Sequence, residues 1–460
     1  MSRVVSLALL LDTLIGELAL FAAAGYLLFA LDDLAVDLIY FVRAGWRALA
    51  VYSRYPRAFA ASLPPARRPG RLAVFIPAWV EAAVIGPMLR AALRRFVHDD
   101  YRLFVGFYRN DPATGAAIAA VNDPRVRAVA LDLDGPTTKA DCLNHLYRAL
   151  VADEKAGAPR AKAIVLHDAE DLVHPLELKL YDRLVERAAL VQLPVVPLLD
   201  KGSPWVAGHY ADEFAEAHIK ELVVREAVGA SIPLAGVGCA IERRALDQLA
   251  ADHNGLPFAP DSLTEDYELG LRLGALGRKT MFVRLPAAPG SRQVVASRGH
   301  FPATIDAAVR QKARWIGGIA MTGWDTLGWR GGLGERWFRM RDRRGPLAAI
   351  LLLAGYAAAV LWAELALSHA LGAPHAFRPS PLLRALLGIN FVLLLWRVAM
   401  RAAFTATAYG AAEGARAVPR LLVANLIAIR AAWRAAAIHR RGGPLKWDKT
   451  AHIFPAELSS

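Results

Sequence analysis

The sequence predicts an α/β domain built on a mostly parallel sheet, joined to an α-helical transmembrane region. Between residues 71 and 285, short apolar runs alternate with helical patterns, which is typical of strands and helices that build a parallel sheet. Outside this region lie three apolar stretches that are each long enough to cross a bilayer as a helix. Hydrophobic residues make up 55% of the chain, a high share for a protein without a membrane part.

The first apolar stretch, residues 4–30, is predicted to be a transmembrane helix. It contains Asp12 and Glu17, and because charges are costly in lipid we expect it to have a partner or to be partly interfacial. Two further acids, Asp32 and Asp33, are predicted to close it. Arginines follow, so the positive-inside rule predicts a cytoplasmic flank and an N-terminus that faces outward. These arginines are Arg43, Arg47, Arg54, Arg57, Arg67 and Arg68.

Apolar periodicity predicts the elements of the α/β region. The expected strands cover residues 71–78, 101–107, 126–131, 163–167 and 279–283. The expected helices cover residues 82–96, 114–121, 139–156, 176–190, 212–228 and 263–276, and a further helix is expected at 304–329.

A cluster of acids, Asp168, Glu170 and Asp171, follows the strand expected at 163–167. Acids at the carboxyl end of a buried parallel strand lie where open α/β sheets bind ligands. Asp168 and Glu170 are two residues apart, so on an extended chain they point the same way, and a turn can bring in Asp171. Such carboxylates suit Mg²⁺ or Mn²⁺, which bind phosphate-bearing substrates. The alternative is a solvated loop before a helix N-terminus, where acids are also favoured.

A second acidic stretch, Thr264-Glu265-Asp266, opens an expected helix. One interpretation is structural, because threonine is a good N-cap and acids suit the first turn of a helix. The other is chemical, because a carboxylate at a helix start beside a sheet is well placed to accept a proton from a hydroxyl nucleophile. The stretch alone leaves both interpretations open.

Gln311, Arg314 and Trp315 are predicted to share one face of the helix expected at 304–329. An arginine binds phosphate oxygens in a bidentate manner, and the face of an indole ring suits a sugar. The alternative is a snorkelling arginine beside an interfacial tryptophan, because tryptophan is favoured where a membrane meets water.

An arginine-rich run at 336–344 precedes a second predicted span at 346–368, and a third span is predicted at 381–404. By the positive-inside rule the second span leaves the cytoplasm and the third returns. Residues 416–441 form an arginine-rich amphipathic segment that is predicted to lie at the cytoplasmic surface. A fourth crossing by this segment stays an alternative, although its arginines disfavour it.

The formal net charge is +13, from 55 Lys+Arg and 42 Asp+Glu. A basic balance fits nucleic acid, a membrane surface or a phosphorylated substrate. The arginine runs adjoin apolar spans, which favours lipid headgroups, so no nucleic-acid partner is predicted. Cys142 and Cys239 lack a Cys or His at metal-site spacing and are expected to be reduced thiols packed as small apolar residues.

Three other features resemble ligand sites. His167 adjoins Asp168, but a histidine packed against a neighbour at the end of a strand is the preferred interpretation. Gly236-Val237-Gly238 does not open a helix as a phosphate loop would, so close backbone packing is expected there. His300 lies between the two later motifs, in a loop that could close over a ligand.

Asp168-Ala169-Glu170, Thr264-Glu265-Asp266 and Gln311-x-x-Arg314-Trp315, in this order and flanked by membrane spans, resemble the motifs of the processive, membrane-embedded family 2 glycosyltransferases. Cellulose and hyaluronan synthases are members of this family. Each motif is weak by itself, but three in order at these spacings are specific. The supporting stretches, which extend the resemblance over nearly the whole chain, are residues 77–81, 108–111, 137–144 and 447–455.

The resemblance implies a GT-A fold and a nucleotide-diphosphate sugar as donor, with a UDP-sugar expected. On the donor side it implies that Pro77, Glu81 and Asp111 surround the nucleobase and ribose and that Lys139 approaches the diphosphate. The acceptor is expected to be a glycan or a lipid-linked sugar. With no enzyme nucleophile evident, a single inverting displacement is expected.

The resemblance also implies catalytic roles. Asp266 would be the general base, with Glu265 and Arg314 as the other catalytic residues. Gln311 and Arg314 would hold the leaving diphosphate, and Trp315 would stack on the acceptor sugar. Loss of a nucleoside diphosphate develops negative charge that a metal and an arginine stabilise.

Asp168 and Glu170 would hold the metal, Mg²⁺ or Mn²⁺, that bridges the diphosphate. Many relatives have Asp where this chain has Glu170, which would shift the metal, and Asp171 could substitute. The expected number of spans, three, is smaller than in cellulose synthases, so a secretion channel built by one chain is doubtful, and no separate regulatory domain is evident.

These observations predict a multi-pass protein of the bacterial inner membrane whose catalytic domain is cytoplasmic. The expected parts are a transmembrane helix and flank at 1–43, a GT-A domain at 44–302, interfacial helices at 303–345, two transmembrane helices at 346–412 and an amphipathic segment with a tail at 413–460. Membrane lipids and an outer-membrane or periplasmic export partner would complete the system. The alternative is a non-catalytic scaffold of an export or phage adsorption complex.

Overall fold

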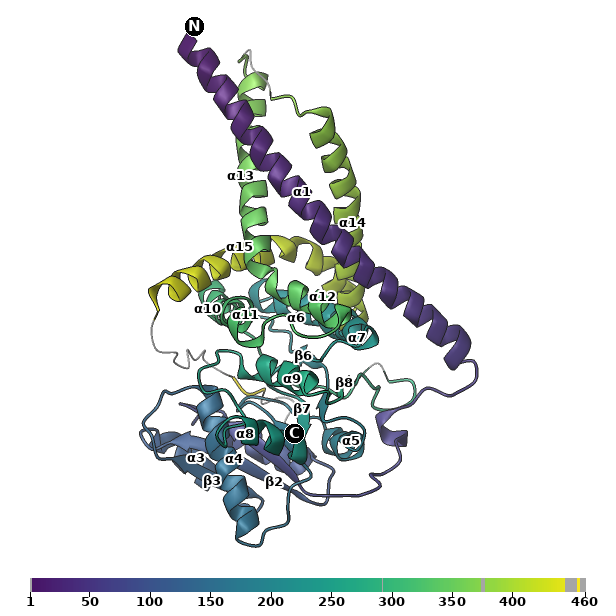
Figure 1. The fold of residues 1–460 in the computed structure, drawn as a ribbon, viewed down its shortest axis with the longest axis vertical. Coiled ribbons are helices and arrows are strands. Elements are labelled where there is room, and N and C mark those ends of the chain that lie inside the picture. The colour runs from purple at the N-terminus through teal and green to yellow at the C-terminus, as the bar shows by residue number, and fades with distance from the viewer. Residues whose placement is uncertain (1, 292, 374–376, 443–452, 456–460) are drawn as a thin grey trace.

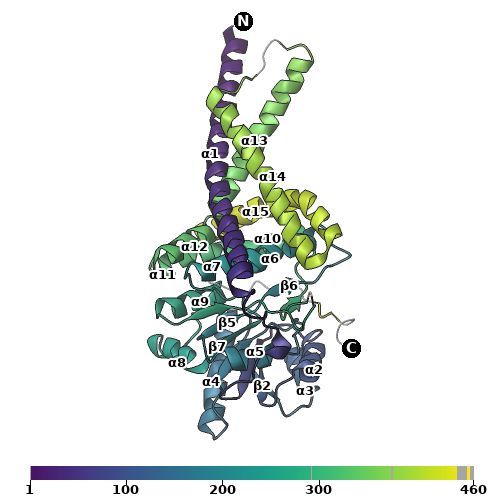
Figure 2. The ribbon, with the colours of Figure 1, turned by 90° about the vertical axis from the view of Figure 1, so that its right-hand side faces the viewer.

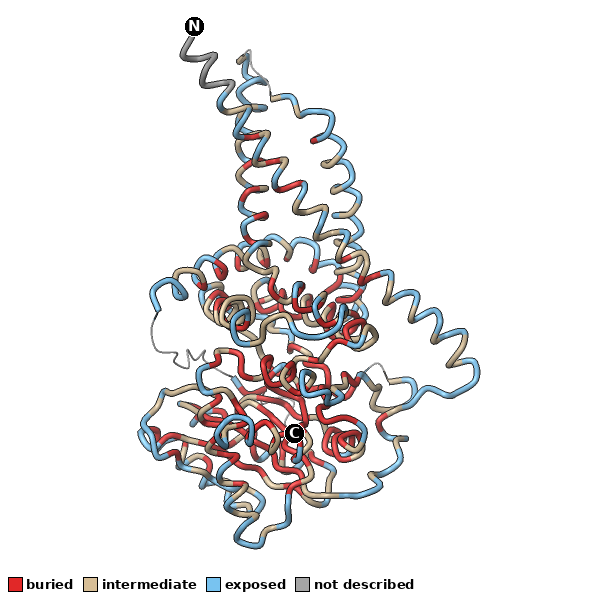
Figure 3. Tube along the Cα trace, in the orientation of Figure 1, coloured by how far each residue is buried: buried red, intermediate tan, exposed pale blue. Residues whose placement is uncertain are grey.

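The computed structural model describes residues 2–291, 293–373, 377–442 and 453–455. It divides into an α/β domain at one end and long helices at the other, and the beginning of the first long helix lies far from the sheet (Figure 1). Buried residues concentrate in the α/β domain, whereas the long helices are mostly exposed or half-buried (Figure 3). The predicted fold class, an α/β domain joined to apolar helices, is therefore confirmed.

The main sheet has seven strands in the order β3-β2-β1-β4-β7-β5-β8. All neighbouring strands are parallel except at β7, which runs antiparallel to both β4 and β5. A second, two-stranded parallel sheet pairs β6 with β9. The strands are β1 Leu72–Pro77, β2 Tyr101–Tyr108, β3 Val126–Leu131, β4 Ala163–Leu166, β5 Leu190–Gln192, β6 Val195–Pro197, β7 Cys239–Glu242, β8 Thr280–Phe282 and β9 Ser297–Gly299.

The alternation of side chains along β1 builds two cores, one on each face of the sheet. Leu72 and Val74 pack in one core, which also receives residues of α2, α3 and α5. Ala73 and Phe75 pack in the other core, with residues of α4, α8 and α9. These helices are α2 Ile85–Arg95, α3 Pro112–Ala119, α4 Lys139–Lys155, α5 Glu177–Leu184, α8 Arg243–Asp252 and α9 Glu265–Ala275. The helix expected at 176–190 was wrong at its end, because the chain turns after α5 and enters β5 at Leu190.

A layer of shorter helices lies between the sheet and the long helices in both views (Figures 1 and 2). Each of the two long helices expected here, at 212–228 and 304–329, contains a π-helical turn, which appears as η3 and η4. The elements are α6 Val206–Glu216, η3 Ala217–Glu221, α7 Leu222–Ala227, α10 Ile305–Ile316, η4 Gly317–Thr322, α11 Gly323–Leu327 and α12 Leu333–Arg343.

Four stretches are long and apolar enough to cross a membrane: Leu10–Val51, Gly345–Ala370, Pro381–Tyr409 and Ala411–Arg441. The second and third are the helices α13 and α14, close to their expected bounds. The fourth is α15, which packs on α6 and α10 and runs across the axis of α13 (Figure 1). The orientation of α15 favours the prediction that this segment lies at the membrane surface. Its length and composition alone would also allow it to cross the membrane.

The first long helix, α1, runs from Ser2 to Trp46, so the prediction that Asp32 and Asp33 close it was wrong. Both acids are paired with the C-terminal end of α12: the C-cap residue Arg344 donates to Asp32 and to Asp33 at 2.6 Å each, and Arg341 also bonds both acids. The helix can therefore continue past these residues, because their charges are neutralised by partners far along the chain.

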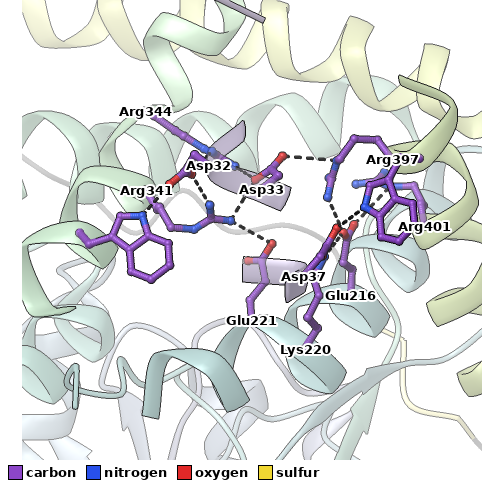
Figure 4. Close-up of polar contacts among 12 residues, drawn as sticks. Asp32, Asp33, Asp37, Glu216, Lys220, Glu221, Arg341, Arg344, Arg397 and Arg401 are labelled. Atoms are coloured by element: carbon purple, nitrogen blue, oxygen red, sulfur yellow. Dashed lines mark hydrogen bonds and ion pairs between the residues drawn. The ribbon is translucent and has the colours of Figure 1, made fainter. Parts of the chain in front are cut away.

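The same cluster of charges extends to a third acid of α1, Asp37 (Figure 4). The Lys220 ammonium lies 2.5 Å from Asp37 and 2.7 Å from Glu216, and Arg397 of α14 lies 2.7 Å from Glu216. Asp37 and Lys220 are buried. This charge cluster joins α1 to the helical layer and to α14.

We predict that Lys220→Met destabilises the protein by about 3–5 kcal/mol, because Asp37 would stay buried without its ammonium partner. Unfolding in detergent, followed by circular dichroism, measures the change. Arg430→Met is the matched control, since the Arg430–Asp306 pair is largely exposed and should contribute at most about 1 kcal/mol. Equal stability of Lys220→Met and wild type would contradict the role of this cluster.

Candidate active site

A cavity of about 680 Å³ opens at the carboxyl ends of β1 and β4. This is the edge at which open α/β sheets bind ligands. Among the segments that line it are the end of β1, the start of α4, the loop after β4, the start of α9 and one face of α10. The predicted site residues that it brings together are Pro77, Glu81, Lys139, Asp168, Glu170, Glu265, Asp266, Gln311, Arg314 and Trp315.

Lys139 stands among three carboxylates in this cavity. Its ammonium lies 2.5 Å from Asp168, and the charges of Glu265 and Asp266 also act on it. Burial alone would lower the pKa of Lys139, but the three carboxylates outweigh burial and raise it, so the ammonium stays charged. Thr138 positions this lysine by accepting a hydrogen bond from the Asp141 N–H at 3.1 Å and capping α4.

The two acids at the start of α9 have raised pKa values. Burial is the main cause for both, and the neighbouring charge of Asp266 raises the pKa of Glu265 further. Gly236, at φ +78°, packs so close that an added Cβ would collide with Asp266 and lie 3.3 Å from the Lys139 ammonium. The expected close backbone packing at this glycine is confirmed. Thr264 is the N-cap residue, but its side chain forms no capping hydrogen bond.

His167 is fully buried behind the acidic loop. Its ring bonds Asp171 at 2.9 Å and Glu177 at 2.6 Å, which raises the pKa of the imidazole to about 10 against the opposing effect of burial. The preferred interpretation, a packed histidine, is confirmed. Asp171 also accepts a hydrogen bond from the Asp168 N–H at 3.0 Å, so its carboxylate holds the loop that presents Asp168 and Glu170.

The acidic loop has the donor set of a partial metal site. Among the described residues, no group of three His, Cys, Asp or Glu side chains could hold a metal without other ligands. Asp168 and Glu170 nevertheless both line the cavity. Mg²⁺ and Mn²⁺ are commonly bound by one or two carboxylates together with substrate phosphates, so these residues fit a metal that arrives with a diphosphate.

One face of α10 closes the cavity on the side of the long helices. The side-chain oxygen of Gln311 is buried and has no hydrogen-bond partner within the described parts of the chain, so a ligand that donates a hydrogen bond would satisfy it. The Trp315 ring meets the Tyr210 ring edge to face at 6.2 Å. Lys312 bonds Glu213 at 2.6 Å and so joins α10 to α6.

Asp111 is the one predicted site residue that does not line the cavity. Its carboxylate accepts the Val80 N–H at 2.6 Å and the Thr114 N–H at 3.3 Å, which caps α3. Val80 has φ +55°, a strained conformation for a β-branched residue, and this hydrogen bond holds it there. Asp111 thus supports the turn that presents Glu81. Direct contact with a nucleobase stays a prediction.

Sequence reasoning assigned no site residue in two segments that line the cavity. The loop 299–304 lines it over its whole length, including His300, which was considered only as a closing residue. Ile453 also lines it, and Phe454 is buried in the core that also holds residues of β1 and α2. The apolar Ile453-Phe454-Pro455 was the available signal; residues 447–452 of the same stretch lie outside the described residues.

Comparisons with known proteins agree with this geometry. The family described as "Glycosyltransferase like family 2" matches residues 69–318. Bacteriophage adsorption protein B of Escherichia coli K12 and bacteriophage N4 adsorption protein B of Escherichia coli O157:H7 are each 38% identical over 458 residues. The alignments cover 93% of this chain and 60% of each relative, so the chain spans about three-fifths of their length. The resemblance to the family 2 glycosyltransferases, predicted from the motifs, is therefore confirmed.

Among solved structures, the mannosyltransferase PcManGT from Pyrobaculum calidifontis, in complex with GDP-Man and Mn²⁺, aligns with a TM-score of 0.53 at 17% identity. The alignment covers 89% of this chain and 99% of that chain. At this identity the likeness concerns the fold, and it confirms the expected GT-A architecture.

We predict that His167→Ala destabilises the protein by about 3–5 kcal/mol, because Asp171 and Glu177 would stay buried without their cation. Chemical unfolding in detergent measures the loss, with His253→Ala, at an exposed position, as the control. Unchanged stability combined with lost affinity for Mn²⁺ would show that His167 is a metal ligand after all.

Proposed function

The chain belongs to glycosyltransferase family 2, and we propose that it transfers a sugar from a nucleoside-diphosphate sugar to a hydroxyl of a polysaccharide or lipid-linked acceptor. The observation that carries this proposal is the single cavity in which Lys139, Asp168, Asp266 and Arg314 meet from four separate segments. A non-catalytic scaffold would not need this set of charged side chains in one cavity.

On the donor side, Pro77 and Glu81 would lie against the nucleoside, and Lys139, Gln311 and Arg314 would bind the diphosphate. The charge that develops on a leaving diphosphate is stabilised by cations held in place before the reaction, and Lys139 is held by the carboxylates around it. A UDP-sugar is the donor we expect from the motifs.

Asp168 and Glu170 would hold Mg²⁺ or Mn²⁺, which would supply positive charge to the diphosphate. Asp266 would accept the proton of the acceptor hydroxyl as the sugar is transferred in one inverting displacement. Its raised pKa makes the carboxylate a stronger base at neutral pH. Glu265 would add a further negative charge beside Asp266 and Lys139. Trp315 would stack its ring on the acceptor sugar.

The four apolar stretches indicate membrane association. We propose the bacterial inner membrane, with the domain at 44–302 in the cytoplasm, the spans at 1–43 and 346–412, and the interfacial parts at 303–345 and 413–460. An outer-membrane or periplasmic export partner would receive the product. The alternative is a non-catalytic scaffold of an export or phage adsorption complex. The two relatives are named as adsorption proteins, which is consistent with the second of these complexes.

We predict that Asp266→Asn lowers sugar transfer by roughly 10²–10⁴-fold, because the amide cannot accept the proton, while donor affinity stays nearly unchanged. Release of nucleoside diphosphate from a panel of UDP- and GDP-sugars measures transfer, and equilibrium binding measures donor affinity. Asp252→Asn, at an exposed position, is the control. Equal loss of both quantities would contradict the base assignment, and a wild type that neither binds nor cleaves any donor would favour the scaffold.

We predict that Asp168→Asn weakens Mn²⁺-dependent donor binding by roughly tenfold or more, because the metal loses a charged ligand. Donor titrations with Mn²⁺, and with chelator in its place, measure the effect. Wild-type donor affinity that does not respond to chelator would exclude the metal from donor binding.

A further inference from the structure

A second cavity of about 530 Å³ adjoins the first. Asp266 and Trp315 line both cavities, so they stand at the junction. The walls of the second cavity come from α6, η3 and α7 on one side and from α12 on another. None of Asp168, Glu170 or Lys139 lines it, so a molecule bound there would reach Asp266 without contacting those three residues.

The second cavity lies between Asp266 and the charge cluster at the foot of the long helices. Arg341 and Arg344 line it, and the same two residues bind Asp32 and Asp33 of α1 (Figure 4). Two π-helical turns border it through Ala217 and Ile319, and such turns occur frequently at functional sites. The cavity therefore faces the membrane part of the protein.

The guanidinium of Arg225, in the wall of this cavity, has one nitrogen without a hydrogen-bond acceptor among the described residues. Arg225 is 2% exposed; its Nε donates to the Ser231 carbonyl at 2.6 Å and its Nη1 donates to the Asp342 carboxylate at 2.9 Å. Its Nη2 is buried and finds no acceptor among the residues that the structure describes. A buried donor without an acceptor costs free energy, which a bound oxygen atom would recover.

The charge of the lining excludes an anionic ligand. Three guanidinium groups, of Arg225, Arg341 and Arg344, face four carboxylates, of Glu213, Glu221, Asp266 and Asp342. Each of these arginines is already paired with an acid. Burial lowers the pKa of His218 to about 4, so this lining residue adds no charge at neutral pH. A phosphate or carboxylate would meet no spare positive charge.

We propose that the second cavity is the acceptor site and that it binds the end of an uncharged glycan, with Arg225 as a binding residue. This inference rests on the proposed function, in which Asp266 activates a hydroxyl of the acceptor. It adds that this hydroxyl belongs to a neutral sugar. Sugar hydroxyls both donate and accept hydrogen bonds, and the rings of Phe214, Tyr267 and Trp315 offer apolar faces to sugar C–H groups. Tyr267 is held by a hydrogen bond to Asp342 at 2.7 Å, which links Arg225 to the residue beside the base.

Direct binding of oligosaccharides to the full chain in detergent tests the inference without requiring turnover. Calorimetric titration would use neutral hexasaccharides of glucose and N-acetylglucosamine, a hexagalacturonate, and a polyprenyl phosphate. Two variants target the site: Ala217→Phe fills the cavity from η3, and Arg225→Lys removes the spare N–H. Ala251→Phe, at an exposed position of α8, is the matched control for added bulk.

The expected result is that at least one neutral oligosaccharide binds and that both variants weaken it by about tenfold or more, with donor affinity within about twofold of wild type. Ala251→Phe should leave both affinities unchanged. Preference for the galacturonate or the polyprenyl phosphate would overturn the inference, as would unchanged oligosaccharide affinity in Ala217→Phe. Absence of any oligosaccharide binding also overturns it, and donor cleavage in the same preparation shows separately whether the proposed function stands.

Discussion

The ion pairs of Asp32 and Asp33 with Arg341 and Arg344 determine how the long helices meet the α/β domain. Charges taken out of water are tolerated only when each has a partner, so α1 has one depth and one rotation at which its acids are satisfied. The two arginines lie at the C-terminal end of α12, and the same helix carries Asp342, which bonds Tyr267 beside Asp266. The contact that holds α1 in place therefore also positions the wall of the second cavity next to Asp266, the proposed base.

The sheet edge that carries the candidate active site has its own balance of charge. Lys139 is the ammonium within a group of carboxylates whose mutual repulsion would otherwise be large. The raised pKa values of Glu265 and Asp266 follow from burial in spite of this ammonium. A buried acid with a raised pKa is a stronger base, and a lysine held by acids is available to an arriving diphosphate. The same local charges would thus serve both halves of a transfer reaction.

Long, uniformly apolar strands could be predicted from the sequence, whereas short ones could not. β1 and β2 lie within a residue of their expected bounds, because runs of mostly apolar residues are typical of strands buried on both faces. β3 also matches its expected bounds, although it is an edge strand and most of its residues are not buried. β5 and β7 were missed. Each has only three or four residues, and β7 is a strand because Ala240 pairs with Val165 on one side and Val191 on the other. Such pairing has no local signal, and the π-helical turns η3 and η4 have none either.

The sequence by itself determined which residues are candidates for the chemistry and in what order they occur, together with the apolar stretches that are long enough to cross a membrane. Only the tertiary structure decided which buried charge finds which partner. In the structure Asp111 accepts a hydrogen bond from the Val80 backbone, and His167 bonds two acids. Asp33 pairs with Arg341, which is 308 positions away in the sequence. The physical reason is that periodicity reports which way a side chain faces, whereas the cost of burying a charge is set by whatever the fold brings opposite it.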